Sequence, residues 1–331
     1  MKKILITGGA GFIGCHLIKH ILNNEENEVT AVDNLQRGQM DKDFKAVLNE
    51  PRVKFIQADV TDFEFYQTLD ADFDHIYHLA AVNGTKLFYE MPTEVLRINT
   101  LSLIYILEWI KNLEKKPKLC FTSSNEAYAS ALAAFGQLPI PTPENVPLVI
   151  EDSYNPRWSY AGSKLIGELL VIHYAQTYNF PAVIVRPHNF YGPRAGFGHV
   201  IPGLCEKIIK RVDPLPLPGA GETRAFCYIT DAVKAMQMLM DSAATDRQPA
   251  ATVHIGGTNE ITMRELAKKM FAVAGWQPQH FLIQPSPRGS VQRRLADISK
   301  IKNLVGWQPE ISLEEGLKNT FAWYQDNLRQ Q

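Results

Sequence analysis

A glycine-rich segment between an apolar strand and an amphipathic helix constrains this chain most. The segment Thr7–Gly14 (TGGAGFIG) follows the apolar run Ile4–Ile6 and precedes a helical pattern of apolar residues that continues to Leu22. Its glycines fit the spacing Gly-x-Gly-x-x-Gly, which joins a strand, a tight turn and a helix. Unpaired N–H groups at the start of a helix bind phosphate groups. The order therefore predicts a parallel α/β fold with a dinucleotide diphosphate at this turn.

A carboxylate at the end of the second apolar strand indicates which dinucleotide binds. The run Val29–Asp33 ends in an acid that stands 19 residues after Gly14. An acid at this place hydrogen-bonds the adenosine ribose hydroxyls and repels a 2′-phosphate. The sequence therefore predicts NAD. The alternative is a βαβ turn without a ligand, because glycines also mark ordinary turns.

Composition excludes several other classes of partner. The chain has 331 residues, of which 45% are hydrophobic, and its net charge is −1, so it offers no basic surface for nucleic acid or an anionic membrane. No apolar run reaches membrane-spanning length, and the N-terminal run indicates a buried strand rather than a signal sequence. Four scattered cysteines show no metal-ligand spacing: Cys15, Cys120, Cys205 and Cys227. We therefore expect reduced thiols, no metal site and a cytoplasmic protein.

Strand-like and helical patterns alternate in the first part of the chain. The apolar runs cover 4–7, 29–33, 53–58, 75–80, 119–123 and 182–186, and helical patterns cover 94–112 and 158–178. This alternation predicts a Rossmann-type doubly wound parallel sheet. Ligands of such sheets bind beyond the carboxyl ends of the strands. We therefore expect one edge to be lined by Gly8, Asp33, Asp59, Ala80 and Ser124.

The alternation weakens after Arg186. Helical patterns then cover 200–211, 231–241, 262–274 and 312–328, and short strand-like runs cover 251–256 and 281–283. We expect an NAD-binding domain over 1–187 and a smaller, interleaved α/β lobe over 188–331 that binds the substrate. Residues 129–157 contain five prolines and predict a long loop over the active site.

Tyr160 and Lys164 form the second strong signal. Their spacing of four places a phenol and an ammonium on one helix face, a turn apart. A free tyrosine has a pKa of about 10, but a neighbouring Lys⁺ and a positive nicotinamide ring favour the phenolate. We expect Tyr160 to take a proton from a sugar hydroxyl while the carbon gives a hydride to NAD⁺. The alternative is a surface pair without a function.

The chain resembles the extended short-chain dehydrogenases/reductases of the nucleotide-sugar epimerase and dehydratase group. Matching segments extend over nearly the whole chain: Thr7–Gly14, Asp33–Asn34, Asp59–Val60, His78–Ala81, Asn99, Thr122–Ser124, Tyr160 with Lys164, Arg186–Pro193, Arg224–Asp231 and Arg294–Lys300. This set is specific for the group and much less specific for the reaction.

The resemblance implies a coenzyme role for many of these positions. The implied contacts with NAD are Gly8, Gly11, Phe12, Ile13, Gly14, Asp33, Asn34, Asp59, Val60, Leu79, Ala80, Ala81, Asn99, Tyr160 and Lys164. Asp59 and Val60 would touch adenine. The alternatives are capping of strand ends by Asp59 and Asn99, and core packing of the apolar members.

The resemblance also implies contacts with a nucleotide sugar. Ser124 would hydrogen-bond the reacting hydroxyl, unless its hydroxyl only caps a turn. Asn189, Arg224 and Arg294 would bind the diphosphate, because the planar arginine fork binds phosphate oxygens in pairs. Arg293 is the alternative to Arg294.

The chain departs from the family pattern beside Ser124. Dehydratases of the group carry an acid–acid pair where this chain has Asn125 and Glu126, and Asn125 cannot donate a proton as a carboxylic acid does. Simple 4-epimerases usually lack the glutamate, whereas glucuronate decarboxylases have a small polar residue before it. Glu126 is therefore either catalytic or a structural carboxylate. In the family, a lysine sometimes follows the alanines after strand four. This chain has the segment Val82–Lys86 at that place instead.

Three hypotheses for the function follow. The first is an NAD-dependent epimerase of a nucleotide-diphosphate sugar that passes through a 4-keto intermediate. The alternative is a 4,6-dehydratase, decarboxylase or C5-epimerase in which Glu126 is the base, and a second alternative is a non-catalytic NAD-sensing protein. The helical patterns 94–112 and 158–178 resemble those that pair in a four-helix bundle, so we expect a homodimer.

Overall fold

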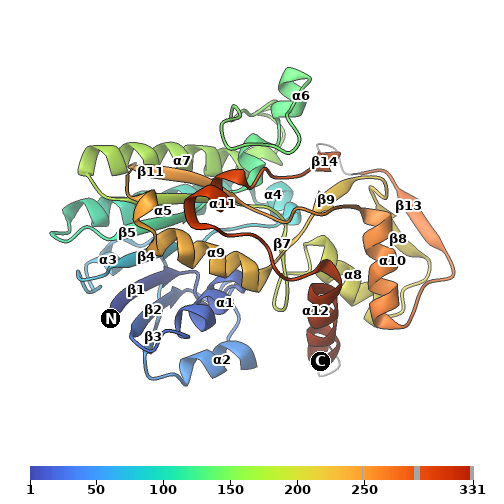
Figure 1. The fold of residues 1–331 in the computed structure, drawn as a ribbon, viewed down its shortest axis with the longest axis horizontal. Helices are drawn as coiled ribbons and strands as arrows, with labels where there is room; N and C mark the ends of the chain where they lie inside the picture. Colours follow the sequence, from blue (N-terminus) through green and yellow to red (C-terminus); the bar gives the residue numbers. More distant parts are fainter. Residues whose placement is uncertain (248, 287–290, 329–331) are drawn as a thin grey trace.

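A seven-stranded parallel sheet forms the centre of the protein (Figure 1). The computed structural model describes residues 1–247, 249–286 and 291–328. The strand order is β11-β6-β5-β4-β1-β2-β3. The strands are β1 (Lys2–Thr7), β2 (Asn27–Asp33), β3 (Val53–Gln57), β4 (His75–His78), β5 (Lys118–Thr122), β6 (Ala182–Pro187) and β11 (Ala250–Ile255). This topology confirms the predicted Rossmann-type sheet.

Helices cover both faces of the sheet, which explains why its strands are almost continuously apolar. One face carries α1 (Phe12–Ile21) and α9 (Ile229–Asp241), and the other carries α5 (Pro92–Asn112) and α7 (Trp158–Tyr178) (Figure 1). Successive side chains of a strand point to opposite faces. In β1, Ile4 and Ile6 therefore pack in the core cluster of α1 and α9, whereas Leu5 packs in the cluster of α5 and α7.

The register aligns the strand ends at the edge where ligands bind. Thr7, the last residue of β1, pairs with Val32 of β2 and with His78 of β4. His78 in turn pairs with Phe121 of β5. The loops that follow these four strands therefore begin side by side. They contain α2 (Lys42–Leu48), α4 (Thr85–Glu90) and the 3₁₀ turn Asn125–Tyr128, and α3 (Phe63–Tyr66) follows the neighbouring strand β3.

A second group of elements lies beyond this edge of the sheet (Figure 1). Its helices are α8 (Val200–Ile209), α10 (Met263–Ala274) and α12 (Leu313–Leu328). Its small sheets contain β7 (Phe190–Tyr191), β8 (Leu215–Pro218), β9 (Thr223–Ala225), β10 (Cys227–Tyr228), β12 (Glu260–Thr262), β13 (Phe281–Gln284) and β14 (Arg293–Arg294). Helix α11 (Ser299–Val305) packs on β11 and α9 instead, and a 3₁₀ turn at Ala243–Thr245 lies beside the first residue of β5, at the opposite edge.

The two expected regions share the central sheet. Strand β11 comes from residues 250–255 and pairs with β6, so a segment of the second region completes the sheet of the first. The division at residue 187 itself stays a prediction. The expected loop 129–157 contains the short helix α6 (Ala131–Phe135). Its sequence is rich in alanine and ends at Gly136 in a left-handed conformation, which favours a helical turn before the prolines begin.

Candidate active site

The glycine turn after β1 is packed too tightly for any other residue. Gly8 has φ of +74°, and a Cβ there would lie 2.8 Å from the backbone nitrogen of Ala80. A Cβ on Gly14 would lie 2.2 Å from the carbonyl oxygen of Gly8. Gly11 precedes the first residue of α1 and has no side chain to cap it. The first N–H groups of α1 are therefore available to an anion.

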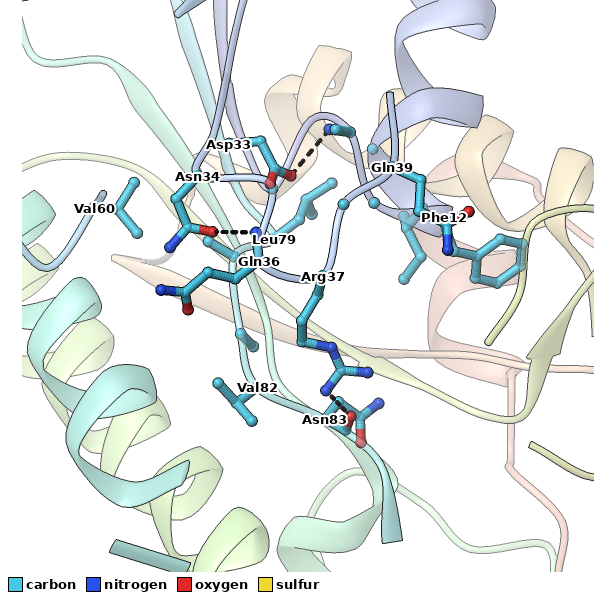
Figure 2. Close-up of a pocket in the computed structure, with 18 of the residues that line it drawn as sticks. Phe12, Asp33, Asn34, Gln36, Arg37, Gln39, Val60, Leu79, Val82 and Asn83 are labelled. Carbon is cyan, nitrogen blue, oxygen red and sulfur yellow. Dashed lines mark hydrogen bonds between the residues drawn. The ribbon is translucent and has the colours of Figure 1, made fainter. Parts of the chain in front are cut away.

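A cavity of about 280 Å³ lies over this turn (Figure 2). Twelve residues expected at the coenzyme line it: Gly8, Gly11, Phe12, Ile13, Gly14, Asp33, Asn34, Asp59, Val60, Leu79, Ala80 and Ala81. They come from the ends of four neighbouring strands, as the sheet rule requires. A glycine cradle at a helix start, with acids at the ends of β2 and β3, fits a dinucleotide.

The two acids also organise the loops that carry them. The Asp33 carboxylate accepts hydrogen bonds from the backbone N–H groups of Ala10 (3.1 Å) and Leu35 (2.8 Å), and burial raises its pKa. Asp59 accepts a hydrogen bond of 3.2 Å from the side chain of Asn34. Both carboxylates thus fix the walls of the cavity and face into it.

Sequence reasoning missed two arginines that line the cavity, Arg37 and Arg194. Arg194 is buried and donates hydrogen bonds to the carbonyls of Ala10 and Gly11, and it forms an ion pair of 2.7 Å with Asp41. It follows directly after the family segment that ends at Pro193, and this position was the available signal. Gln36, Gln39, Asn83 and His199 also line the cavity without having been expected.

Asn99 lies behind the cavity wall and is absent from the lining residues in the described part of the chain. Its side chain accepts a hydrogen bond from the backbone N–H of Val82 (2.7 Å) and donates to the carbonyl of Val82 and to the hydroxyl of Ser163 (both 3.1 Å). Asn99 therefore ties the loop after β4 to helix α7. Direct contact of Asn99 with the coenzyme stays a prediction.

Tyr160, Ser124 and Lys164 meet beside this cavity. Tyr160 packs with Val82, which lines the cavity, and its ring stacks on Phe88 with centroids 4.9 Å apart. Ser124 lowers the pKa of Tyr160, and its hydroxyl caps the 3₁₀ turn by accepting a hydrogen bond of 3.1 Å from the backbone N–H of Glu126. The Lys164 ammonium lies 5.5 Å from the centroid of the Tyr160 ring, on the same helix face, as the spacing of four predicts. Its Nζ donates a hydrogen bond to a main-chain carbonyl at the end of β5.

Burial is the largest influence on the pKa values of Tyr160 and Lys164. It raises the pKa of Tyr160, while Ser124 and the charge of Arg37 lower it. Burial also lowers the pKa of Lys164 to about 7. Both groups lose the hydration of their charged forms on burial. The expectation that Lys164 favours the phenolate stays a prediction.

Glu126 lies between two arginines. Arg294 Nη1 is 2.6 Å from one carboxylate oxygen, and Arg157 Nη2 is 3.4 Å from the other. Burial raises the pKa of Glu126, but the charges of Arg294 and Arg157 outweigh it, so the net pKa is lowered. Glu126 is therefore ionised next to Ser124. Arg157 was missed by sequence reasoning, because no motif marks it.

The remaining expected substrate residues lie on β9 and around it. Arg224 forms an ion pair of 2.8 Å with Glu222, and the Asn189 side chain donates a hydrogen bond of 2.8 Å to the carbonyl of Ala225. Arg293 forms an ion pair with Glu260 at the surface and points away from Glu126. Of the two adjacent arginines, Arg294 is the one at the site.

In residues 1–247, 249–286 and 291–328, no helix combines the length and the apolar composition needed to cross a membrane. Within the same described residues, no three His, Cys, Asp or Glu side chains are grouped so that they could hold a metal ion.

Comparison with known proteins gives one family. The family model of GDP-mannose 4,6 dehydratase matches residues 5–320. The chain is 31% identical over 326 residues to UDP-glucuronic acid decarboxylase 6 of Arabidopsis thaliana, covering 95% of this chain and 86% of that protein. It is also 31% identical to a putative UDP-glucose 4-epimerase of Methanocaldococcus jannaschii, covering 98% and 99% of the two chains.

Solved structures agree with these relatives. The dTDP-glucose 4,6-dehydratase DesIV of Streptomyces venezuelae, solved with NAD bound, superposes with a TM-score of 0.87 at 26% identity and covers 99% of this chain and 98% of its own. The match extends over both the sheet and the second group of elements. The chain therefore belongs to the GDP-mannose 4,6 dehydratase family of extended short-chain dehydrogenases/reductases and is an enzyme of its NAD-dependent nucleotide-sugar epimerase and dehydratase class.

Proposed function

We propose that this enzyme binds NAD and a nucleotide-diphosphate sugar, and that it oxidises the sugar transiently at C4. The observation that carries this proposal is the placement of Tyr160 against the wall of the cavity, with Ser124 acting on its pKa and Lys164 one turn away. Bound NAD⁺ would supply a reversible hydride acceptor. Such a trio has no use in a protein that only senses NAD.

Tyr160, Ser124 and Lys164 have different roles in removing the proton during this oxidation. Tyr160 takes the proton of the C4 hydroxyl, and Ser124 hydrogen-bonds the oxygen from which it leaves. Lys164 donates to a backbone carbonyl and holds a position beside the ring, where its positive charge favours the phenolate when it is protonated. The charge of Arg37 also lowers the pKa of the phenol.

Inversion at C4 is the outcome that the surroundings of the trio support best. Elimination of water needs a proton donor for the leaving hydroxyl, and Asn125 stands where that acid would be. Glu126 is ionised and held by two arginines, so its oxygens are already occupied as acceptors. The 4-keto sugar would therefore turn in the site and receive its hydride on the other face.

Decarboxylation of a sugar acid is the second candidate. It is favoured by Arg294 and Arg157, which could bind a C6 carboxylate in exchange for Glu126. Oxidation at C4 places a ketone β to that carboxylate, so the C5–C6 bond can break, CO₂ leaves, and C5 takes a proton. The 31% identity to a UDP-glucuronic acid decarboxylase agrees with this candidate.

The nucleotide end of the substrate would bind between the sheet and the second group of elements. We propose Asn189 and Arg224 as contacts of the diphosphate, with Arg224 exchanging its partner Glu222 for a phosphate. Arg294 lies beside Glu126 and would reach the substrate nearer its sugar.

A homodimer through α5 and α7 belongs to the same proposal. These helices pack on each other and expose Leu96 (40%), Ile166 (42%) and Leu169 (48%). A second copy could cover these side chains by forming a four-helix bundle. The mass of the protein in solution tests this part.

Mass spectrometry of the product separates the candidates. Incubation with a panel of UDP-, GDP-, dTDP- and CDP-sugars and sugar acids should yield an isomer of unchanged mass if C4 is inverted. A product that has lost CO₂ would identify the decarboxylase, and a product that has lost water would contradict both candidates. The absence of turnover with the whole panel would favour the NAD sensor.

A further inference from the structure

Arg37 spans the coenzyme cavity. It lies on the loop between β2 and α2, and its Nη1 donates a hydrogen bond to the backbone carbonyl of Asn83, on the loop after β4 (Figure 2). These two loops form opposite walls of the cavity. The next residue, Gly84, has φ of +130°, and a Cβ there would lie 3.8 Å from Arg37 Nη2. The guanidinium is thus held over the opening by the backbone of the facing loop.

Arg37 is the lining arginine with donors to spare. The guanidinium of the other one, Arg194, forms an ion pair with Asp41 and donates hydrogen bonds to the carbonyls of Ala10 and Gly11. The Arg194 side chain is only 4% exposed. The hydrogen bond with Asn83 engages one donor of Arg37, and a guanidinium carries five. A diphosphate brings two negative charges into a cavity whose walls already contain the carboxylates of Asp33 and Asp59.

The direction of the side chain places it away from the adenosine end. Asp33 ends β2 and Asp59 lies just beyond β3, on one side of the glycine turn. Arg37 extends toward Asn83 on the β4 side (Figure 2). Asn83 follows Val82, which packs against Tyr160. Because Arg37 donates to the carbonyl of Asn83, the neighbour of Val82, its guanidinium lies on the same side of the cavity as the reacting group. An arginine so directed is far from a ribose 2′-phosphate.

We propose that Arg37 binds the phosphate of NAD nearer the nicotinamide ribose and closes the cavity over the coenzyme. The fork of Arg37 contacts this phosphate from the side opposite to the N-terminus of α1, while its bond to Asn83 joins the two walls. The diphosphate is then held from both sides. This closure retains the coenzyme in its site while the keto sugar turns. The inference rests on the proposed NAD site.

Coenzyme fragments test this placement. We compare dissociation constants of NAD⁺, ADP-ribose, AMP and adenosine for the wild type, Arg37→Gln and Arg37→Lys, measured by calorimetry without substrate. Arg37→Gln should weaken NAD⁺ and ADP-ribose about tenfold or more, because a charge-assisted bidentate contact is lost. Adenosine should bind equally well, and AMP should lose much less than ADP-ribose. Arg37→Lys keeps the charge without the planar fork. Its dissociation constants for NAD⁺ and ADP-ribose should therefore lie between those of the wild type and those of Arg37→Gln.

Arg264→Gln is the matched control, since it removes the same charge from an exposed position of α10. It should leave all four constants unchanged. Equal affinity of the wild type and Arg37→Gln for ADP-ribose would overturn the inference, and so would an equal loss for adenosine, which indicates a damaged cavity. A wild type that binds no NAD⁺ at all would instead overturn the proposed function.

Discussion

Arg294 and Glu126 form an ion pair of 2.6 Å beside Ser124, although they are far apart in the sequence. Both side chains are largely buried, at 13% and 17% exposure. Arg157 approaches the other oxygen of the same carboxylate. The pair connects β14 to the turn after β5, so it joins the second group of elements to the edge of the sheet.

Removal of Arg294 should destabilise the protein. Arg294→Met leaves Glu126 buried with Arg157 as its remaining cation, and the free energy of unfolding at neutral pH should fall by about 3 kcal/mol. Denaturant unfolding measures this difference. Arg293→Met is the matched control, because Arg293 pairs with Glu260 at the surface and should change stability little. Equal stability of the two variants would show that the buried pair contributes nothing.

The stability contributed by this pair should depend on pH. The arginines lower the pKa of Glu126 in the folded protein, so the stabilisation is complete above the ordinary pKa of glutamate, about 4.3, and is lost as the pH falls through the lowered value. The difference in unfolding free energy between wild type and Arg294→Met should therefore shrink in acid. A difference that stays constant from neutral pH to acid would contradict this assignment.

Tyr160→Phe should lower turnover by about a hundredfold or more while leaving NAD bound, because it removes only the group that exchanges a proton. Steady-state kinetics and the coenzyme content of the purified variant provide the two measurements. Tyr154→Phe is a suitable control, since Tyr154 is 95% exposed and should behave as the wild type. Near-normal turnover of Tyr160→Phe would remove the basis of the proposed mechanism.

Asp33→Asn should relax the preference for NAD over NADP. The amide retains an oxygen for the backbone N–H groups of Ala10 or Leu35 but no longer repels a 2′-phosphate. We expect the ratio of the two dissociation constants to move toward NADP by about tenfold, equivalent to about 1.4 kcal/mol. Asp70→Asn, an exposed site, should not change the ratio. An unchanged ratio in Asp33→Asn would place the discrimination elsewhere.

Arg194→Met should loosen the glycine turn. The variant loses the ion pair with Asp41 and the hydrogen bonds to the carbonyls of Ala10 and Gly11, all of them at least partly buried. The free energy of unfolding should fall by about 3 kcal/mol, and NAD binding should weaken with it. Thermal unfolding with and without NAD tests both parts. Arg264→Met serves as the exposed control, and a variant as stable as this control would disprove the role of Arg194 as a support.

Local sequence determined the parallel sheet and the coenzyme edge. The alternation of apolar runs and helical patterns, and the glycines of Thr7–Gly14, depend on neighbours within a few residues, so they can be recognised without a structure. The same holds for Asp33, which ends a strand, and for Tyr160 and Lys164, which share a helix face. These features correspond to the parts that the structure confirmed.

Only the tertiary structure decided which side chains oppose one another. Arg294 rather than Arg293 meets Glu126 because β14 pairs with β9 in a register that turns one arginine inward and the other outward. Arg37 reaches the carbonyl of Asn83 across a cavity, and Asn99 holds a loop instead of lining that cavity. Pairings between distant segments, and the burial that shifts the pKa of Tyr160 and Lys164, arise from packing of the whole chain and leave no local pattern in the sequence.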